Sequence, residues 1–317
     1  MGRRGLAALI GCAFLLSSCS LEDPPGGDGR MSIATGGSGG VYQVYGGGVA
    51  EMFSANGHPT TAETTSASVD NLFLVADGDS EVAFSLADTA IDAVEGRDSF
   101  DGEKLPLRAL GTLYSNFTHV VALKSSGITK IEDLKGKKVS IGAPNSGTEV
   151  IGLRLLEVAG LNPDTDVTRR ALGVGESAAA LREGSIDAFV WSGGLPTGAI
   201  TDLATTDEVV LLPLDAYLPK LNEQYGEAYV EAEVEEGEYP NVAPVKTISV
   251  PNVLMVREDM DPQLAHDLLK LMFDHKAELA EVHPSAEKLT LEDAQKVVEP
   301  VELHEGAQQY YQEAATE

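Results

Sequence analysis

Strand-like and helix-like segments alternate along most of this chain, and the alternation begins twice. Short apolar runs bounded by Gly, Ser or polar residues are typical of strands, and apolar positions three or four residues apart are typical of helices. The strands expected in the first series are 31–35, 60–64, 82–86 and 107–114, and those in the second are 119–123, 138–142, 187–191 and 253–257. This alternation predicts an α/β fold with a mainly parallel sheet.

The C-terminal part of the chain departs from the alternation. Residues 262–281 and 291–298 have helical periodicity with no strand between them, so we expect this tail to pack back on the first series. Two connections, near 116–119 and 249–252, would then form a hinge with a ligand cleft between two lobes. The expected boundaries are residues 31–118 with 253–317 for lobe 1, and residues 119–252 for lobe 2.

The N-terminal segment has the pattern of an export signal. Two arginines precede an apolar run from Gly5 to Leu16, which is too short for a membrane-spanning helix. The run ends in Leu16-Ser17-Ser18-Cys19, which resembles the bacterial lipobox, where the cysteine receives a lipid and becomes the mature N-terminus. We expect a signal peptide at residues 1–18, lipidation of Cys19 and a flexible tether at residues 19–30. The alternative is an ordinary secreted protein with a stray cysteine.

The charge balance excludes two classes of partner. The chain has 22 Lys+Arg against 50 Asp+Glu, a formal net charge of −28. Because phosphate neutralisation needs a basic face, nucleic acid is not expected as a partner, and neither is an anionic membrane bound through basic patches. No His, Cys, Asp or Glu cluster has metal-ligand spacing, so no metal or cofactor is expected. The acidic stretch 231–238 is interpreted as a solvated charge run.

A loop of five small residues, Gly36-Gly37-Ser38-Gly39-Gly40, separates the first strand from a helix expected at Val41. Small residues let a ligand approach the backbone, and a helix N-terminus offers unpaired N–H donors to an anion. The ligand-binding residues expected here are Gly37, Ser38, Gly39, Gly40 and Tyr42. A tight turn without a ligand is one alternative. A G-x-S-x-G hydrolase nucleophile at Ser38 is another, and it fits poorly because that fold places several strands before the nucleophile.

A matching loop at residues 143–148 leads into a helix in the second series. It lacks the lysine of a Walker loop, so nucleotide binding is not expected. Its polar and small residues suit both helix capping and carboxylate binding. The ligand-binding residues expected here are Asn145, Ser146, Gly147 and Thr148.

Further candidates lie where strands lead into helices or end at the crevice. At the junction 64–71, Ser68 is expected to cap a helix, which leaves Ser66 and Asn71 as ligand candidates. Asp88 follows the third strand, where its side chain would either cap the next helix or meet an ammonium group. The candidates at strand ends are Tyr114 and Gly193, with Trp191 and Gly194 beside them, although Trp191 also suits the core.

These segments together resemble the TAXI-type solute-binding proteins of tripartite ATP-independent periplasmic (TRAP) transporters. One matching segment is Ala34-Thr35-Gly36-Gly37-Ser38-Gly39-Gly40-Val41-Tyr42. The order of all the matching segments along the chain is more specific than any one of them. The other matching segments are residues 46–48, 66–71, 107–110, 113–114, 133–139, 142–148, 184–189, 283–284, 303–307 and 310–311. The resemblance implies a type II periplasmic-binding-protein fold whose two lobes close over glutamate, glutamine or a related carboxylate. Where the family often shows Gln-Ser-Asp, this chain has Leu86-Ala87-Asp88, which implies a less polar rim.

The resulting hypothesis is a non-enzymatic, lipid-anchored extracytoplasmic protein, on the periplasmic or outer face of the cell membrane. It would deliver a small carboxylate, either glutamate- or glutamine-like or a dicarboxylate, to a TRAP-type permease driven by an ion gradient. By this resemblance, the residues that bind the ligand would be those of the first glycine-rich loop, Tyr42, the 66–71 junction and the 145–148 loop. Two alternatives stay open: a secreted serine hydrolase using Ser38, and a ligand sensor or adhesin that does not transport.

Overall fold

The computed structural model describes residues 29–316, so the expected signal peptide, Cys19 and most of the expected tether lie outside the described residues. The strands are β1 Met31–Ala34, β2 Thr60–Glu63, β3 Val82–Leu86, β4 Leu107–Leu123, β5 Lys138–Ser140, β6 Thr168–Arg170, β7 Ala188–Gly193, β8 Val209–Leu211, β9 Val230–Val234 and β10 Val245–Arg257. The α-helices are α1 Val41–Ala55, α2 Ser68–Asp77, α3 Ala87–Glu95, α4 Gly147–Val158, α5 Val174–Arg182, α6 Gly198–Thr206, α7 Leu218–Tyr225, α8 Pro262–Asp274, α9 Lys276–Val282, α10 Leu291–Ala294 and α11 Glu305–Ala314.

All of these strands belong to one sheet, in the order β2-β1-β3-β10-β4-β7-β5-β6, with β8 paired to β4 and β9 to β10. The pairs β1–β2, β1–β3, β5–β6 and β5–β7 are parallel. Every pair that includes β4 or β10 is antiparallel. The predicted α/β class is therefore confirmed, but the sheet is mixed rather than mainly parallel, because two long strands run against their neighbours through its middle.

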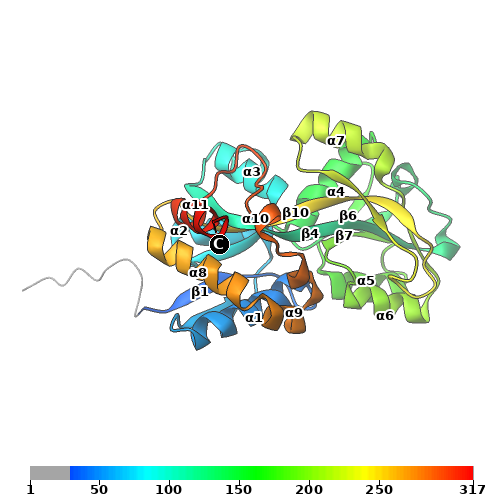
Figure 1. Cartoon of the computed structure of the whole chain (residues 1–317). Coiled ribbons are helices and arrows are strands. Elements are labelled where there is room, and N and C mark those ends of the chain that lie inside the picture. The colour runs from blue at the N-terminus through cyan, green and yellow to red at the C-terminus, as the bar shows by residue number, and fades with distance from the viewer. Residues whose placement is uncertain (1–28, 317) are drawn as a thin grey trace, which may run out of the picture.

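Strand β4 unites two strands that the sequence pattern separates. The expected strands 107–114 and 119–123 are one continuous strand, because residues between them pair with β10, with Asn116 opposite Val250 and Phe117 opposite Ser249. Beyond this point β4 pairs with β7 instead. The strands β4 and β10 thus cross together from one half of the molecule to the other, with α1, α8 and α11 on one side of the crossing and α4 to α7 on the other (Figure 1).

The acidic stretch 231–238 is partly a strand, which corrects its interpretation as a charge run alone. Strand β9 pairs with residues 245–249 of β10 and leaves its glutamates exposed. Two other short strands, β6 and β8, are absent from the expected series; all three residues of β6 are exposed and carry no apolar alternation. The expected helix at 291–298 is shorter, as α10 ends at Ala294.

The helical tail packs on the first α/β half, as expected. Residues of α8 and α11 share one core cluster with α1, which includes Tyr45, Leu268 and Tyr311. A close contact fixes α9 against α1, because a Cβ atom on Gly48 would lie 3.0 Å from Val282 Cγ1. The division into lobe 1 (31–118 with the tail) and lobe 2 (119–252) remains a proposal, and we keep these names below.

Candidate functional site

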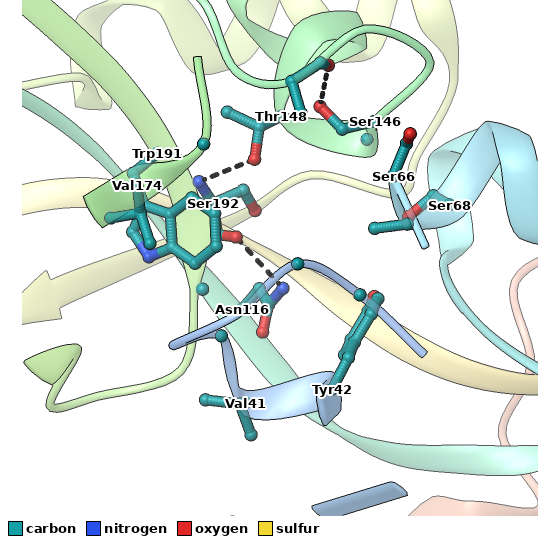
Figure 2. A pocket seen from close by; sticks show the side chains of 18 of the residues that line it. Val41, Tyr42, Ser66, Ser68, Asn116, Ser146, Thr148, Val174, Trp191 and Ser192 are labelled. Carbon is teal, nitrogen blue, oxygen red and sulfur yellow. Dashed lines mark hydrogen bonds between the residues drawn. The ribbon is translucent and has the colours of Figure 1, made fainter. Parts of the chain in front are cut away.

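A cavity of about 560 Å³ lies between the two lobes and is lined from both (Figure 2). Its size falls within the range of about 300–1,000 Å³ that is usual for small-molecule sites. The lining residues are Gly36, Gly37, Ser38, Gly40, Val41, Tyr42, Thr65, Ser66, Ala67, Ser68, Leu86, Asn116, Ala143, Ser146, Gly147, Thr148, Gly173, Val174, Gly175, Glu176, Trp191, Ser192 and Gly193. Of the residues described, no Lys, Arg or His lines this cavity.

Four helices begin at the wall of the cavity. The N-cap residues of α1, α2, α4 and α5 are Gly40, Ala67, Ser146 and Gly173, and each of them lines the cavity. Only Ser146 caps its helix with a side chain, accepting a hydrogen bond from the Glu149 N–H at 3.1 Å. The first-turn N–H groups of a helix have no intrahelical partner and carry partial positive charge. The cavity therefore suits an anionic group although it has no basic side chain.

Two hydroxyl groups beside α4 remain available as donors. Thr148 Oγ1 accepts a hydrogen bond from the Ser192 N–H at 3.2 Å, which leaves its own proton free. Ser192 Oγ is buried without a hydrogen-bond partner in the described part of the chain. Ser146 differs, because its hydroxyl already donates to Ala143 O at 2.7 Å. We infer that Thr148 and Ser192 can donate to a ligand directly, whereas Ser146 holds the loop in shape.

A chain of hydrogen bonds connects the cavity lining to the two crossing strands. The Tyr42 hydroxyl donates to Asn252 Oδ1, and Asn252 Nδ2 donates to Asn116 Oδ1 at 3.0 Å. Asn116 Nδ2 in turn donates to Ser192 O at 3.4 Å. Burial raises the pKa of Tyr42, so its phenol stays protonated. This chain of hydrogen bonds joins α1, β10, β4 and β7, and so links the cavity to the crossing strands.

The lobes touch across the mouth of the cavity. The Asp70 N–H on α2 donates to Asn145 O in the facing loop at 3.2 Å. Gly147 lies directly against lobe 1, since an added Cβ atom would be 2.7 Å from Ser68 Oγ and 2.6 Å from Leu86 Cδ1. Such approaches are shorter than real Cβ contacts, so only glycine fits. The structure therefore has the closed arrangement of the two lobes.

The structure brings many of the expected ligand residues together. The expected residues that line the cavity are Gly37, Ser38, Gly40, Tyr42, Ser66, Ser146, Gly147, Thr148 and Gly193. Gly39 and Asn145 are exposed beside it, both with positive φ, at 84° and 61°. Ser68 lines the cavity but does not cap α2 as expected: the N-cap is Ala67, and Ser68 Oγ accepts the Leu86 N–H at 3.1 Å.

Three expected ligand residues, Asn71, Asp88 and Tyr114, are buried outside the cavity lining. The Asn71 amide donates to Thr35 O at 2.6 Å and to Phe84 O at 2.8 Å, so it ties the ends of β1 and β3 together. The Tyr114 ring packs 6.1 Å from that of Tyr45, and burial raises the pKa of its phenol.

Asp88 belongs to a group of charged and polar residues between the lobes, buried except for Asp98, which we call the interlobe cluster: Asp88, Asp92, Asp98, Arg154 and Tyr229. Arg154 on α4 contacts all three aspartates of lobe 1, at 3.5 Å from Asp88 and 2.5 Å from Asp92 and Asp98. The Tyr229 hydroxyl donates to Asp88 Oδ2 at 2.8 Å. Asp88 therefore meets a cation, as one reading of the sequence suggested, but that cation is the protein's own arginine.

The interlobe cluster predicts a pH dependence of stability. Burial raises the pKa of Asp92 from 3.8 to about 7, although Arg154 opposes this, and Asp88, Asp98 and Arg97 face the same carboxyl. Between pH 3.8 and about pH 7, Asp92 is protonated in the folded state but ionised in the unfolded chain. Its contribution to the free energy of unfolding therefore falls as the pH rises through this range.

We expect the stability of the native protein relative to Asp92→Asn to be greater at about pH 5 than at about pH 8. Urea unfolding at both pH values measures this difference. A difference that grows with pH would contradict the shifted pKa.

Several lining residues were not singled out from the sequence. Asn116 and Ser192 are polar residues inside otherwise apolar strands, which is a weak signal on its own. Gly173 and the first turn of α5, Val174-Gly175-Glu176, bring small residues to a helix start, like the first loop. This segment was overlooked because the strand before it, β6, lacks an apolar pattern. Its recognition would have required searching for small residues before every helix.

Comparison with known proteins places this geometry in context. A model of the NMT1-like family matches residues 33–314. A protein of Bordetella bronchiseptica RB50 is 18% identical, with a TM-score of 0.53, covering 91% of this chain and 81% of that one. A binding-protein component of an ABC phosphonate transporter from Pseudomonas aeruginosa is 13% identical, with a TM-score of 0.51, covering 81% and 78%. A putative L-cystine ABC transporter from Listeria monocytogenes is 12% identical, with a TM-score of 0.50, covering 85% and 99%. These likenesses show the two-lobed fold of periplasmic binding proteins.

The described residues contain neither a candidate membrane span nor a candidate metal site. Within 29–316, no helix has the length and apolar character needed to cross a membrane. In the same range, no group of three or more His, Cys, Asp or Glu side chains is placed to hold a metal ion.

Proposed function

The chain belongs to the NMT1-like family, and we propose that it is an extracytoplasmic solute-binding protein that captures a small carboxylate. The observation that carries this proposal is the convergence of four helix N-termini on one interlobe cavity without a basic side chain. Fixed N–H dipoles bind a carboxylate without the cost of burying a separate cation. The proposal includes no catalytic step.

Ligand capture would work as a population shift between open and closed lobes. Thr148 and Ser192 belong to lobe 2, and Ser66 and the α1 N-terminus belong to lobe 1, so only the closed arrangement contacts a ligand from both sides. A ligand that binds the closed state better moves the equilibrium toward it. The paired strands β4 and β10 would serve as the hinge.

The finer proposal is a TAXI-type subunit that delivers its ligand to a TRAP-type permease. Its support is the order of family-like segments along the chain, from 34–42 to 310–311. Lipidation at Cys19 would hold the protein at the membrane where the permease lies. The formal charge of −28 would then belong to the outer surface, where it favours solubility and steers contact with a partner.

The alternative of a serine hydrolase using Ser38 has little support. Ser38 is exposed at the cavity, and no histidine of the described chain lines that cavity. His119 lies behind the wall with Tyr239 Oη 3.0 Å from its Nε2, and burial lowers its pKa to about 4. A sensor or adhesin would share the cavity, so uptake measured with and without the permease would separate that alternative from transport.

Substitution of Thr148 tests the proposed carboxylate site. We expect Thr148→Val to weaken binding of a carboxylate about tenfold or more, because a hydrogen bond to a charged group contributes about 1.5–3 kcal/mol. Ser146→Ala is the matched control: it removes a helix cap and lowers stability by about 1 kcal/mol, with a smaller effect on affinity. Calorimetric titration measures both. Unchanged affinity in Thr148→Val would overturn this assignment.

A further inference from the structure

The single tryptophan of the chain, Trp191, forms a fixed wall of the cavity. Its indole Nε1 donates to Thr197 Oγ1 at 2.9 Å. The ring also lies against the backbone of Gly193, where an added Cβ atom would be 2.3 Å from Nε1, and near Gly40, where it would be 3.5 Å from Cη2. The hydrogen bond and these close approaches hold the ring in one position, so it presents a preformed aromatic surface.

The cavity has one side formed by Trp191 and Val174 and another side rich in serine hydroxyls. Figure 2 shows Trp191 and Val174 together with Ser192 next to them, and Ser66 and Ser68 on the opposite side with Ser146 near them. The N-terminus of α2, which has no side-chain cap, and the N-terminus of α4 lie on the side with Ser66 and Ser68, with Asp70 and Glu149 in their first turns. A ligand whose anionic group meets these helix ends therefore places the rest of its body toward Trp191.

Among the residues described, the side of the cavity with Trp191 and Val174 has no basic side chain to balance a second negative charge of a ligand. Glu176 is the one acidic residue among the described lining residues, and its Oε2 accepts the Gly173 N–H at 3.2 Å at the start of α5. This carboxylate offsets the positive end of the α5 dipole. No Lys, Arg or His of the described chain lines the cavity to balance a second carboxylate there. A dicarboxylate would bury one charge without a partner and close to Glu176.

We propose that the ligand is a monocarboxylate whose uncharged, apolar or aromatic body lies on Trp191. This inference rests on the proposed carboxylate function and makes its ligand class more specific than the glutamate-like or dicarboxylate ligands that the family resemblance implies. Each methylene group buried against the apolar wall adds about fourfold to affinity. An aromatic ring adds an offset stacking contact with the indole. Trp191 thereby determines specificity.

Three six-carbon acids test the charge of the distal group: hexanoate, adipate and 6-aminohexanoate, with 3-phenylpropanoate and L-glutamate as further ligands. Because Trp191 is the only tryptophan, its fluorescence reports binding directly. We expect hexanoate and 3-phenylpropanoate to bind at least tenfold more tightly than adipate, 6-aminohexanoate or L-glutamate. Tighter binding of any of these last three would overturn the inference and leave the carboxylate function intact. If none of the five acids binds, the proposed function fails, and the inference fails with it.

Two variants test which residues discriminate between these ligands. Their affinities are measured by calorimetry. Glu176→Gln keeps an acceptor for the Gly173 N–H, and we expect it to bind adipate at least threefold more tightly while hexanoate changes less than twofold. Trp191→Leu should weaken 3-phenylpropanoate at least tenfold and hexanoate less. Equal losses for both ligands, or unchanged discrimination in Glu176→Gln, would overturn the roles given to these residues.

Discussion

Replacing Gly147 with valine is expected to weaken ligand binding by about 10- to 100-fold while leaving each lobe folded. Gly147 is the first residue of α4 and lies against Ser68 and Leu86 of the opposite lobe. A side chain there meets both residues at distances shorter than contact, and overpacking of this kind costs about 1–3 kcal/mol. The cost falls on the closed state, because lobe opening separates Gly147 from lobe 1. Apparent affinity falls with the fraction of closed molecules.

Gly175→Ala is the matched control for this substitution. Gly175 also lines the cavity near the start of a helix, but an added Cβ atom there meets nothing within 4 Å. We expect its affinity to stay within about twofold of the native value, since no closed-state contact is disturbed. Calorimetric titration of both variants, with circular dichroism to verify folding, measures the effect. Native affinity in Gly147→Val would show that ligand binding does not require this closed arrangement.

Removing Arg154 is expected to lower the free energy of unfolding by about 3–5 kcal/mol. The Arg154 side chain is only 4% exposed and contacts Asp88, Asp92 and Asp98, which belong to the other lobe. Its guanidinium also lies 4.4 Å from the centre of the Tyr225 ring. Breaking a buried ion pair is strongly destabilising because it leaves uncompensated charge in the interior. The substitution Arg154→Ala leaves the aspartates of the interlobe cluster without this cation.

Arg169→Ala provides the surface comparison. Arg169 pairs with Asp164 on the exterior, with side chains 39% and 75% exposed, so its loss should cost no more than about 1 kcal/mol. Urea unfolding of both variants gives the comparison. If Arg154→Ala is as stable as Arg169→Ala, the interlobe cluster does not join the lobes in the way the distances imply. Because the cluster spans both lobes, Arg154→Ala should also weaken ligand binding.

The architecture was largely predictable because local periodicity encodes it. Strand β3 matches the expected strand 82–86, and helix α3 follows it directly and ends at Gly96 in the left-handed conformation. Strand β4 was not predictable as one element, since Asn116 and Thr118 interrupt its apolar pattern and pair with β10 and β7, respectively, only in the folded state. Likewise, β6 and β9 are exposed strands whose pairing partners, rather than their composition, make them strands.

The candidate site was predictable where one loop carries both the geometry and the chemistry. The residues around Ser38 and Thr148 follow strands and begin helices, so the chain itself places them at the strand ends. Asn71 and Asp88 have the same local signature, but their partners, the backbone of β1 and Arg154 respectively, lie 36 and 66 residues away in the sequence. Long-range contacts decide whether such a side chain faces a ligand or the protein interior, and no local pattern reports them.

The acidic composition and the anion-binding proposal agree once the source of positive potential is identified. The formal charge of −28 excludes a general attraction of anions to this surface. Inside the cavity, helix N-termini act over short distances, where the low local dielectric strengthens them. Recognition of a carboxylate would then depend little on ionic strength, because screening acts mainly on exposed charges.

The most direct test compares a carboxylate with its uncharged amide. The native protein is titrated with hexanoate and hexanamide, and with L-glutamate and its α-amide, while the fluorescence of Trp191 is recorded. The amide keeps the size and shape but lacks the negative charge that helix N-termini at the cavity favour. We predict saturable binding of at least one acid, with the matching amide at least tenfold weaker. An amide that binds as tightly as its acid, or no saturable binding of any acid, would contradict the proposed carboxylate site.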